Sequence, residues 1–184
     1  MEFGIFDHMD HGGQGNLSQF YEDRLGIVEL YDQSGIYAYH LAEHHATPLG
    51  MAPSPNIFLS AVAQRTKKLR FGPLVYCLPL YHPIRLLEEI CMLDQMSGGR
   101  LEMGVGRGIS PIELNYWGIN YDDGPLIYKE VFDLITKGIS DNKLNHNGSS
   151  FQISDMPMNL SLIQQPHPPL WYGVANPSSV EWPA

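Results

Sequence analysis

The sequence predicts an α/β protein of the (β/α)8 or TIM-barrel type, built as a single domain over residues 1–184. Short apolar runs alternate with helix-length amphipathic segments, which is typical of parallel sheets. The first run is followed by Asp7 and His8 instead of Gly-x-Gly-x-x-Gly, which disfavours an open dinucleotide-binding sheet. A complete barrel has eight strands and about 250 residues. We therefore expect a barrel that is truncated after about five strand–helix units.

The first two units are marked by their boundaries. Residues 1–8 form a short apolar run that predicts a strand. Asn16 can cap the helix that follows, and Gly35 falls where that helix should end. Residues 37–43 then predict the second strand.

The alternation continues along the rest of the chain. Two helices and two strands are expected at 56–68 (helix), 69–78 (strand), 83–96 (helix, closed by Gly98 and Gly99) and 101–106 (strand). Beyond them we expect a helix at 125–138, a turn at 145–148 between two short outer strands, and a fifth inner strand at 170–175.

Composition excludes several classes of partner and compartment. Acidic side chains outnumber basic ones by 20 to 11, and the formal charge of −9 leaves no basic face for nucleic acid. No apolar run approaches the ~18 residues of a membrane span. Residues 1–16 do not read as a signal peptide, and two cysteines cannot make a disulfide framework. We expect a cytoplasmic protein that binds neither nucleic acid nor membrane.

Polar residues gather where the predicted strands end, which in a barrel is one mouth. They are Asp7, His8, Asp10 and His11 after the first strand, His40, Glu43, His44 and His45 around the end of the second, Pro79, Tyr81 and His82 after the third, and Arg107 after the fourth. Histidines there suit proton transfer or metal binding, although solvated loop histidines are also compatible with the pattern. The period-two spacing of His40 and His44 permits a metal centre, but no metal-binding motif supports one, so we assign no metal ligand.

Three glycines alternate along the fourth strand, at Gly104, Gly106 and Gly108. They leave one side of the strand without side chains, either to receive a flat ligand or to allow close backbone packing. Arg107 between them is a natural partner for phosphate. Asn176, Ser178 and Ser179, at the start of the last predicted helix, could also hold phosphate, although a simple N-cap explains them equally well; Cys77 and Cys91 are interpreted as core.

Four strings together resemble the bacterial luciferase-like family of flavin-dependent monooxygenases, and particularly the luciferase alpha chain. They are Ala-Glu-His-His at 42–45, Leu-Pro-Leu-Tyr-His-Pro-Ile-Arg at 78–85, Leu-Asp-Gln-Met-Ser-Gly-Gly-Arg at 93–100 and Gly-Val-Gly-Arg-Gly at 104–108. The resemblance implies a (β/α)8 barrel that takes reduced FMN from a flavin reductase and uses dioxygen to oxidise a small substrate such as an aldehyde. The deazaflavin F420, used by relatives, stays open as a cofactor. Residues 164–171 resemble the non-luminous members, so we expect no light emission.

The resemblance also implies roles for individual residues. His44 matches the family's catalytic histidine, with His45 and Glu43 in support. The Leu74–Val75 bond matches a non-proline cis peptide that lies against the flavin ring, and Glu113 matches an acid that affects flavin reactivity. Further implied contacts to the flavin are Gly106, at the position of a reactive cysteine of luciferase, Arg107 on the phosphate, and the phosphate-binding turn of Asn176, Ser178 and Ser179.

Three departures concern the grip on the phosphate. Pro125 stands where the family has an arginine, and Pro177 and Val180 replace hydroxyl residues of the turn. Two other function classes stay open. These departures and the truncation leave a non-catalytic flavin-binding or assembly protein, and the clustered histidines leave a metal-dependent hydrolase on a similar barrel.

Apolar residues lie on more than one side of the predicted helices 56–68 and 83–96, as Ile57 and Met92 illustrate. In the luciferase-like family the corresponding helices pack against a partner subunit. We therefore expect a homodimer or a larger homo-oligomer.

Overall fold

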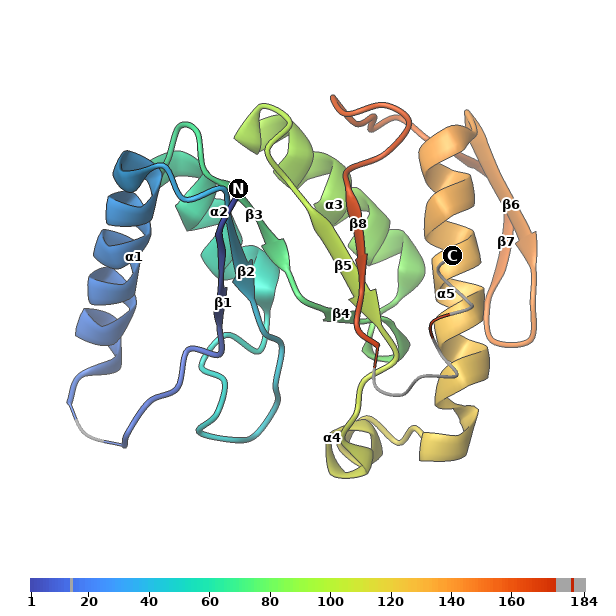
Figure 1. Cartoon of the computed structure of the whole chain (residues 1–184). Helices are drawn as coiled ribbons and strands as arrows, with labels where there is room; N and C mark the ends of the chain where they lie inside the picture. The colour runs from blue at the N-terminus through green and yellow to red at the C-terminus, as the bar shows by residue number, and fades with distance from the viewer. Residues whose placement is uncertain (14, 175–179, 181–184) are drawn as a thin grey trace.

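The computed structural model describes residues 1–13, 15–174 and 180, which form a layer of parallel strands backed by helices (Figure 1). One sheet has the order β1-β2-β3 and the other β4-β5-β8. The bounds are β1 Gly4–Asp7, β2 Ala38–Leu41, β3 Arg70–Pro73, β4 Tyr76–Cys77, β5 Met103–Gly106 and β8 Leu170–Tyr172. The chain itself joins the sheets between β3 and β4, and a bridge between Phe71 and Leu101 joins them again.

Four long helices cover the strands, each contacting the next along the chain. They are α1 Leu17–Ser34, α2 Pro55–Arg65, α3 Pro83–Ser97 and α5 Gly124–Ser140. The expected boundaries are confirmed: the Asn16 side chain accepts the Ser18 N–H at 2.9 Å, and Gly35 and Gly98 end their helices with φ of 77° and 67°. None of the helices in the described part of the chain is long and apolar enough to cross a membrane.

The parallel α/β class is confirmed, whereas a closed barrel is not found among the described strands. No hydrogen-bonded pairing joins β1 to β8, so both sheets are open. Beside the inner strands, an antiparallel hairpin of β6 (Lys143–Asn147) and β7 (Gln152–Pro157) lies on the outer side of α5 (Figure 1).

Several boundaries differ from the sequence-based expectation. The strand expected at 69–78 is broken at the cis peptide Leu74–Val75, so that β3 and β4 belong to different sheets. The turn expected at 145–148 is wrong for its first three residues, which continue β6; the chain reverses after Asn147. The last inner strand ends at Tyr172. A short helix, α4 (Pro111–Tyr116), was not expected.

The segment 93–100 stabilises the fold and lies away from the carboxyl ends of the strands. Asp94 is fully buried, and its carboxylate accepts the backbone N–H groups of Ile163 and Gln164 at 2.6 and 3.1 Å. This contact holds the segment before β8 against α3. A buried carboxylate with several donors is satisfied, so its burial is tolerated.

Arg100 closes the C-terminal end of α2. Its guanidinium donates to the carbonyl oxygens of Ala63, Thr66 and Leu69 and to the Thr66 hydroxyl, at 2.7–3.2 Å. These carbonyls include acceptors that a helix end leaves without intrahelical donors.

His40 corrects one expectation about the histidines. It lies 2.9 Å from Glu102, both side chains are buried, and it is not among the residues of the mouth. Burial alone would raise the pKa of Glu102, but hydrogen bonds from His40, Arg70 and Tyr37 outweigh it and lower that pKa to about 2. His40 therefore belongs to a buried ionic cluster of the fold.

We expect Arg100→Met to lower the free energy of unfolding by about 3 kcal/mol, because several buried carbonyls lose a charged donor. Urea denaturation followed by circular dichroism measures the loss. The matched control is Arg85→Met, which removes an exposed arginine paired with Glu89 on α3 and should cost about 0.5 kcal/mol or less. Equal losses in the two variants would contradict this role for Arg100.

Candidate active site

A cavity of about 720 Å³ opens at the carboxyl ends of the strands, between β2, β4, β5 and β8 on one side and α4 and the start of α5 on the other. Its size is that of a small-molecule site. It is lined by Phe6, Ala42, Glu43, His44, Leu74, Val75, Cys77, Leu80, Gly106, Arg107, Gly108, Ile109, Ser110, Glu113, Leu114, Tyr121, Pro125, Tyr128, Lys129, Tyr172, Gly173 and Val174. Most of these side chains are apolar or aromatic.

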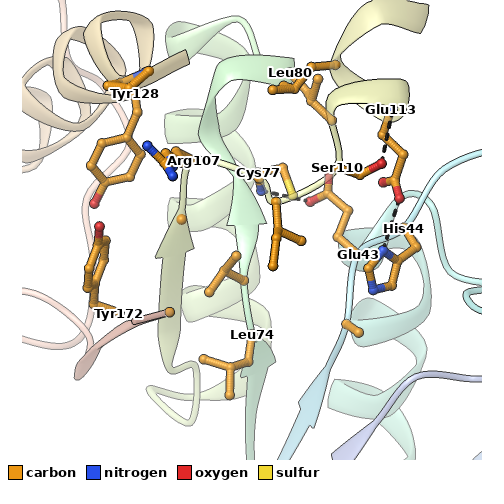
Figure 2. A pocket seen from close by; sticks show the side chains of 18 of the residues that line it. Glu43, His44, Leu74, Cys77, Leu80, Arg107, Ser110, Glu113, Tyr128 and Tyr172 are labelled. Atoms are coloured by element: carbon orange, nitrogen blue, oxygen red, sulfur yellow. Dashed lines mark hydrogen bonds and ion pairs between the residues drawn. The ribbon is translucent and has the colours of Figure 1, made fainter. Parts of the chain in front are cut away.

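The charged groups of the cavity are separated into two ends. Figure 2 shows Glu43, His44 and Glu113 on one side of the cavity and Arg107 with Tyr128 on the other, with Leu74 and Cys77 between them. The cavity therefore has two different ends. One end is acidic and contains His44, and the other is cationic.

At the acidic end, His44 is oriented by Glu113. The Nδ1 atom of His44 lies 3.2 Å from Oε1 of Glu113, and the His44 ring stacks on His8 with 5.6 Å between ring centroids. The other carboxylate oxygen of Glu113 accepts the backbone N–H of His45 at 3.1 Å. With Nδ1 occupied, Nε2 is the ring nitrogen of His44 that remains for a ligand.

Glu113 owes its position to α4. Ser110 caps this helix by accepting the Glu113 N–H at 3.3 Å, and Pro111 occupies its first turn. Ser110-Pro111-Ile112-Glu113 is a capping-box sequence, the signal that could have revealed this helix.

Glu43 is sealed beneath the cavity surface. Its side chain is completely buried and accepts the backbone N–H of Cys77 at 3.2 Å and the hydroxyl of Tyr81 at 2.7 Å. The Nε2 atom of His45 lies 2.9 Å from its other oxygen. His45 packs on Trp117 and does not line the cavity. Of the three residues expected to act together, only His44 has both access to the cavity and incomplete hydrogen bonding in this geometry.

At the cationic end, Arg107 follows β5 directly. It donates to the hydroxyl of Tyr121 at 3.3 Å and lies 5.5 Å from the centroid of the same ring. Lys129 and Pro125, on α5, line the same cavity. Neither Tyr121, Tyr128 nor Lys129 was expected from the sequence, because they belong to no strand end.

The floor between the two ends carries few side chains. The Leu74–Val75 bond is cis, as the resemblance implied. A Cβ at Gly104 would lie 2.2 Å from the carbonyl oxygen of Pro73, and one at Gly106 would lie 2.6 Å from Cγ2 of Val75. Close packing therefore explains both glycines, and it makes Leu74 and Val75 the surface that faces the cavity there.

Cys77 also lines the cavity, although it was interpreted as core. Burial and the nearby carboxylates of Glu43 and Glu113 raise the pKa of the Cys77 thiol. The thiol is therefore protonated near neutral pH.

Among the described residues, His44 is the only histidine that lines the cavity, so the mouth holds fewer histidines than the sequence suggested. Within residues 1–13, 15–174 and 180, no three His, Cys, Asp or Glu side chains are placed to share a metal ion. Asn176, Ser178 and Ser179 lie outside the described residues.

Comparisons with known proteins identify relatives of the chain. A family model described as luciferase-like monooxygenase matches residues 1–184. The protein y4wF of Sinorhizobium fredii is 50% identical over 184 residues, covering 100% of this chain and 54% of that protein. The oxygenase component of a flavin-dependent trigonelline monooxygenase of Acinetobacter baylyi is 30% identical, covering 99% and 51%.

A solved structure also matches. The monooxygenase RslO1 from Streptomyces bottropensis aligns with a TM-score of 0.90 at 27% identity, over 95% of this chain and 54% of that one. The chain thus spans about half the length of the relatives it matches.

Proposed function

The chain belongs to the family of luciferase-like monooxygenases, and from this membership we propose that it forms the flavin-binding part of an oxygenase. The oxygenase uses reduced FMN and dioxygen to oxidise a small organic substrate such as an aldehyde, without emitting light. The observation that carries the proposal is the cavity with a cationic end, a histidine–carboxylate end and a floor poor in side chains between them. The relative from Acinetobacter baylyi is named flavin-dependent, which supports the choice of cofactor.

The residues of the cavity fit FMN. Arg107 binds the phosphate, because a guanidinium offers several donors to its oxygens. Leu74 and Val75, which line the cavity between its two ends, would contact the ring system, and His44 would face the ring from the end opposite Arg107. We include Asn176, Ser178 and Ser179 as further phosphate contacts. F420 remains the alternative cofactor.

When bound, reduced flavin supplies the electrons and the site of reaction with dioxygen. His44 holds or delivers a proton through Nε2, while Glu113 holds Nδ1 and fixes the orientation of the ring. Glu43 and His45 act behind His44 by fixing the loop that carries it. The apolar lining excludes water from the reacting centre.

Assembly completes the proposal. The six strands of the two parallel sheets form part of a (β/α)8 barrel, and we propose that its other strands belong to a further segment like the half of the relatives that this chain does not cover. A separate flavin reductase supplies the reduced cofactor, which suits the name oxygenase component of the trigonelline relative. Ile57 on α2 and Met92 on α3 are exposed apolar side chains on adjacent helices, and they support association into a homo-oligomer.

In the full-length protein, we expect His44→Ala to reduce turnover of an aldehyde by about 10²–10⁴, the usual contribution of a general acid or base, with little change in flavin affinity. Single-turnover kinetics with reduced FMN and dioxygen measure the effect. His82→Ala is the control, because His82 packs against Phe151 and does not line the cavity. Unchanged turnover in His44→Ala would rule out its role, and flavin binding without turnover in the unaltered protein would favour the non-catalytic alternative.

We expect Arg107→Ala to weaken FMN at least tenfold and riboflavin less than twofold, because riboflavin lacks the phosphate that Arg107 contacts. Quenching of flavin fluorescence gives both dissociation constants. A comparable loss for the two ligands would place the phosphate elsewhere.

A further inference from the structure

Lys129 is the second cation of the cavity, and neither the sequence pattern nor the family resemblance assigned it a role. In the part of the chain that the structure describes, Arg107 and Lys129 are the only lysine or arginine residues that line the cavity. Lys129 lies one helical turn beyond Pro125 on α5, and both line the cavity, so this face of the helix is turned toward it.

The ammonium group of Lys129 is paired with an exposed carboxylate. Its Nζ atom lies 2.6 Å from Oδ2 of Asp133, one further turn along α5, and both side chains are more than half exposed. Asp133 is not among the residues of the cavity. Exposed pairs at i and i+4 are weak, so a stronger anion nearby can displace Asp133.

Arg107 alone leaves a phosphate monoester undercompensated. Such a group carries a charge of about −1.5 to −2 near pH 7. The hydrogen-bonding partner of Arg107 in this part of the chain is the neutral hydroxyl of Tyr121. A second cation within reach is required for full compensation, and a lysine ammonium on four methylene groups can change direction without moving the helix.

We propose that Lys129 binds the phosphate of the flavin together with Arg107, and that Asp133 holds the ammonium group aside until the phosphate arrives. The inference rests on the proposed function, because it assumes that the ligand is a flavin phosphate.

Lys137 gives a matched comparison on the same helix. It lies two turns beyond Lys129, donates to the carbonyl oxygen of Asn145 at 2.6 Å and does not line the cavity. Replacing either lysine by methionine changes the net charge equally and keeps an unbranched side chain. Any difference between the two variants therefore reports position and not total charge.

The experiment measures the dissociation constants of oxidised FMN and riboflavin by fluorescence quenching, at two salt concentrations, for the full-length protein, unaltered and in three variants. Lys129→Met should weaken FMN about tenfold and riboflavin less than twofold, and should reduce the dependence of FMN affinity on salt. Lys137→Met should leave both affinities within twofold. Asp133→Asn should strengthen FMN, because Lys129 is then released from its competitor.

The outcomes distinguish failure of the proposed flavin-phosphate site from failure of the role of Lys129 alone. If the unaltered chain binds FMN no better than riboflavin, the proposed flavin-phosphate site fails, and the role of Lys129 fails with it. If the unaltered chain prefers FMN and Lys129→Met keeps that preference, the role of Lys129 alone is overturned. A loss of FMN affinity in Lys137→Met equal to that in Lys129→Met would show a general charge effect and would also overturn it.

Discussion

The backbone of β3 comes very close to the backbone of β5 and of Glu102 before it, and the position of the cavity depends on this contact. A Cβ at Gly72 would lie 1.9 Å from the carbonyl oxygen of Glu102, and a Cβ at Gly104 would lie 2.2 Å from that of Pro73. Only glycine fits where two backbones come this close. The same contact brings β4 beside β5, joins the two sheets and places the Leu74–Val75 bond against Gly104 and Gly106. The cavity floor is therefore a product of backbone packing, and Arg107 enters the cavity because it follows directly on this packed strand.

The charged side chains around that floor differ in how completely their hydrogen bonds are made within the protein. Glu43 is buried with its hydrogen bonds complete, so it stabilises the loop after β2 and offers nothing to a ligand. Glu113 is partly accessible and orients His44. Within the described residues, Arg107 has the neutral hydroxyl of Tyr121 as its hydrogen-bonding partner, and Lys129 has the exposed carboxylate of Asp133. Groups with complete internal partners maintain the fold, and those with weak partners remain available for binding. This distinction separates the structural carboxylates of an acidic protein from those of its site.

Much of the architecture could be predicted from local sequence, because strand and helix periodicity and the cap residues Asn16, Gly35 and Gly98 act over a few neighbouring residues. The break at Leu74–Val75 could be expected only from family resemblance, since it depends on packing against a strand about thirty residues later in the chain. Helix α4 has only six residues, which is too short for a periodic signal. The hydrogen-bonding partner of His40 is Glu102, 62 residues later in the chain. The position of His40 at a strand end therefore could not predict that its side chain is buried.

The central claim is that this cavity holds FMN with its phosphate at the cationic end and its ring over the floor. A crystal structure of the full-length protein with FMN tests it most directly. The account predicts phosphate oxygens within hydrogen-bonding distance of Arg107, the ring in contact with Leu74 and Val75, and the reactive edge toward His44. A phosphate beside Glu113, or a flavin bound outside this cavity, would contradict it.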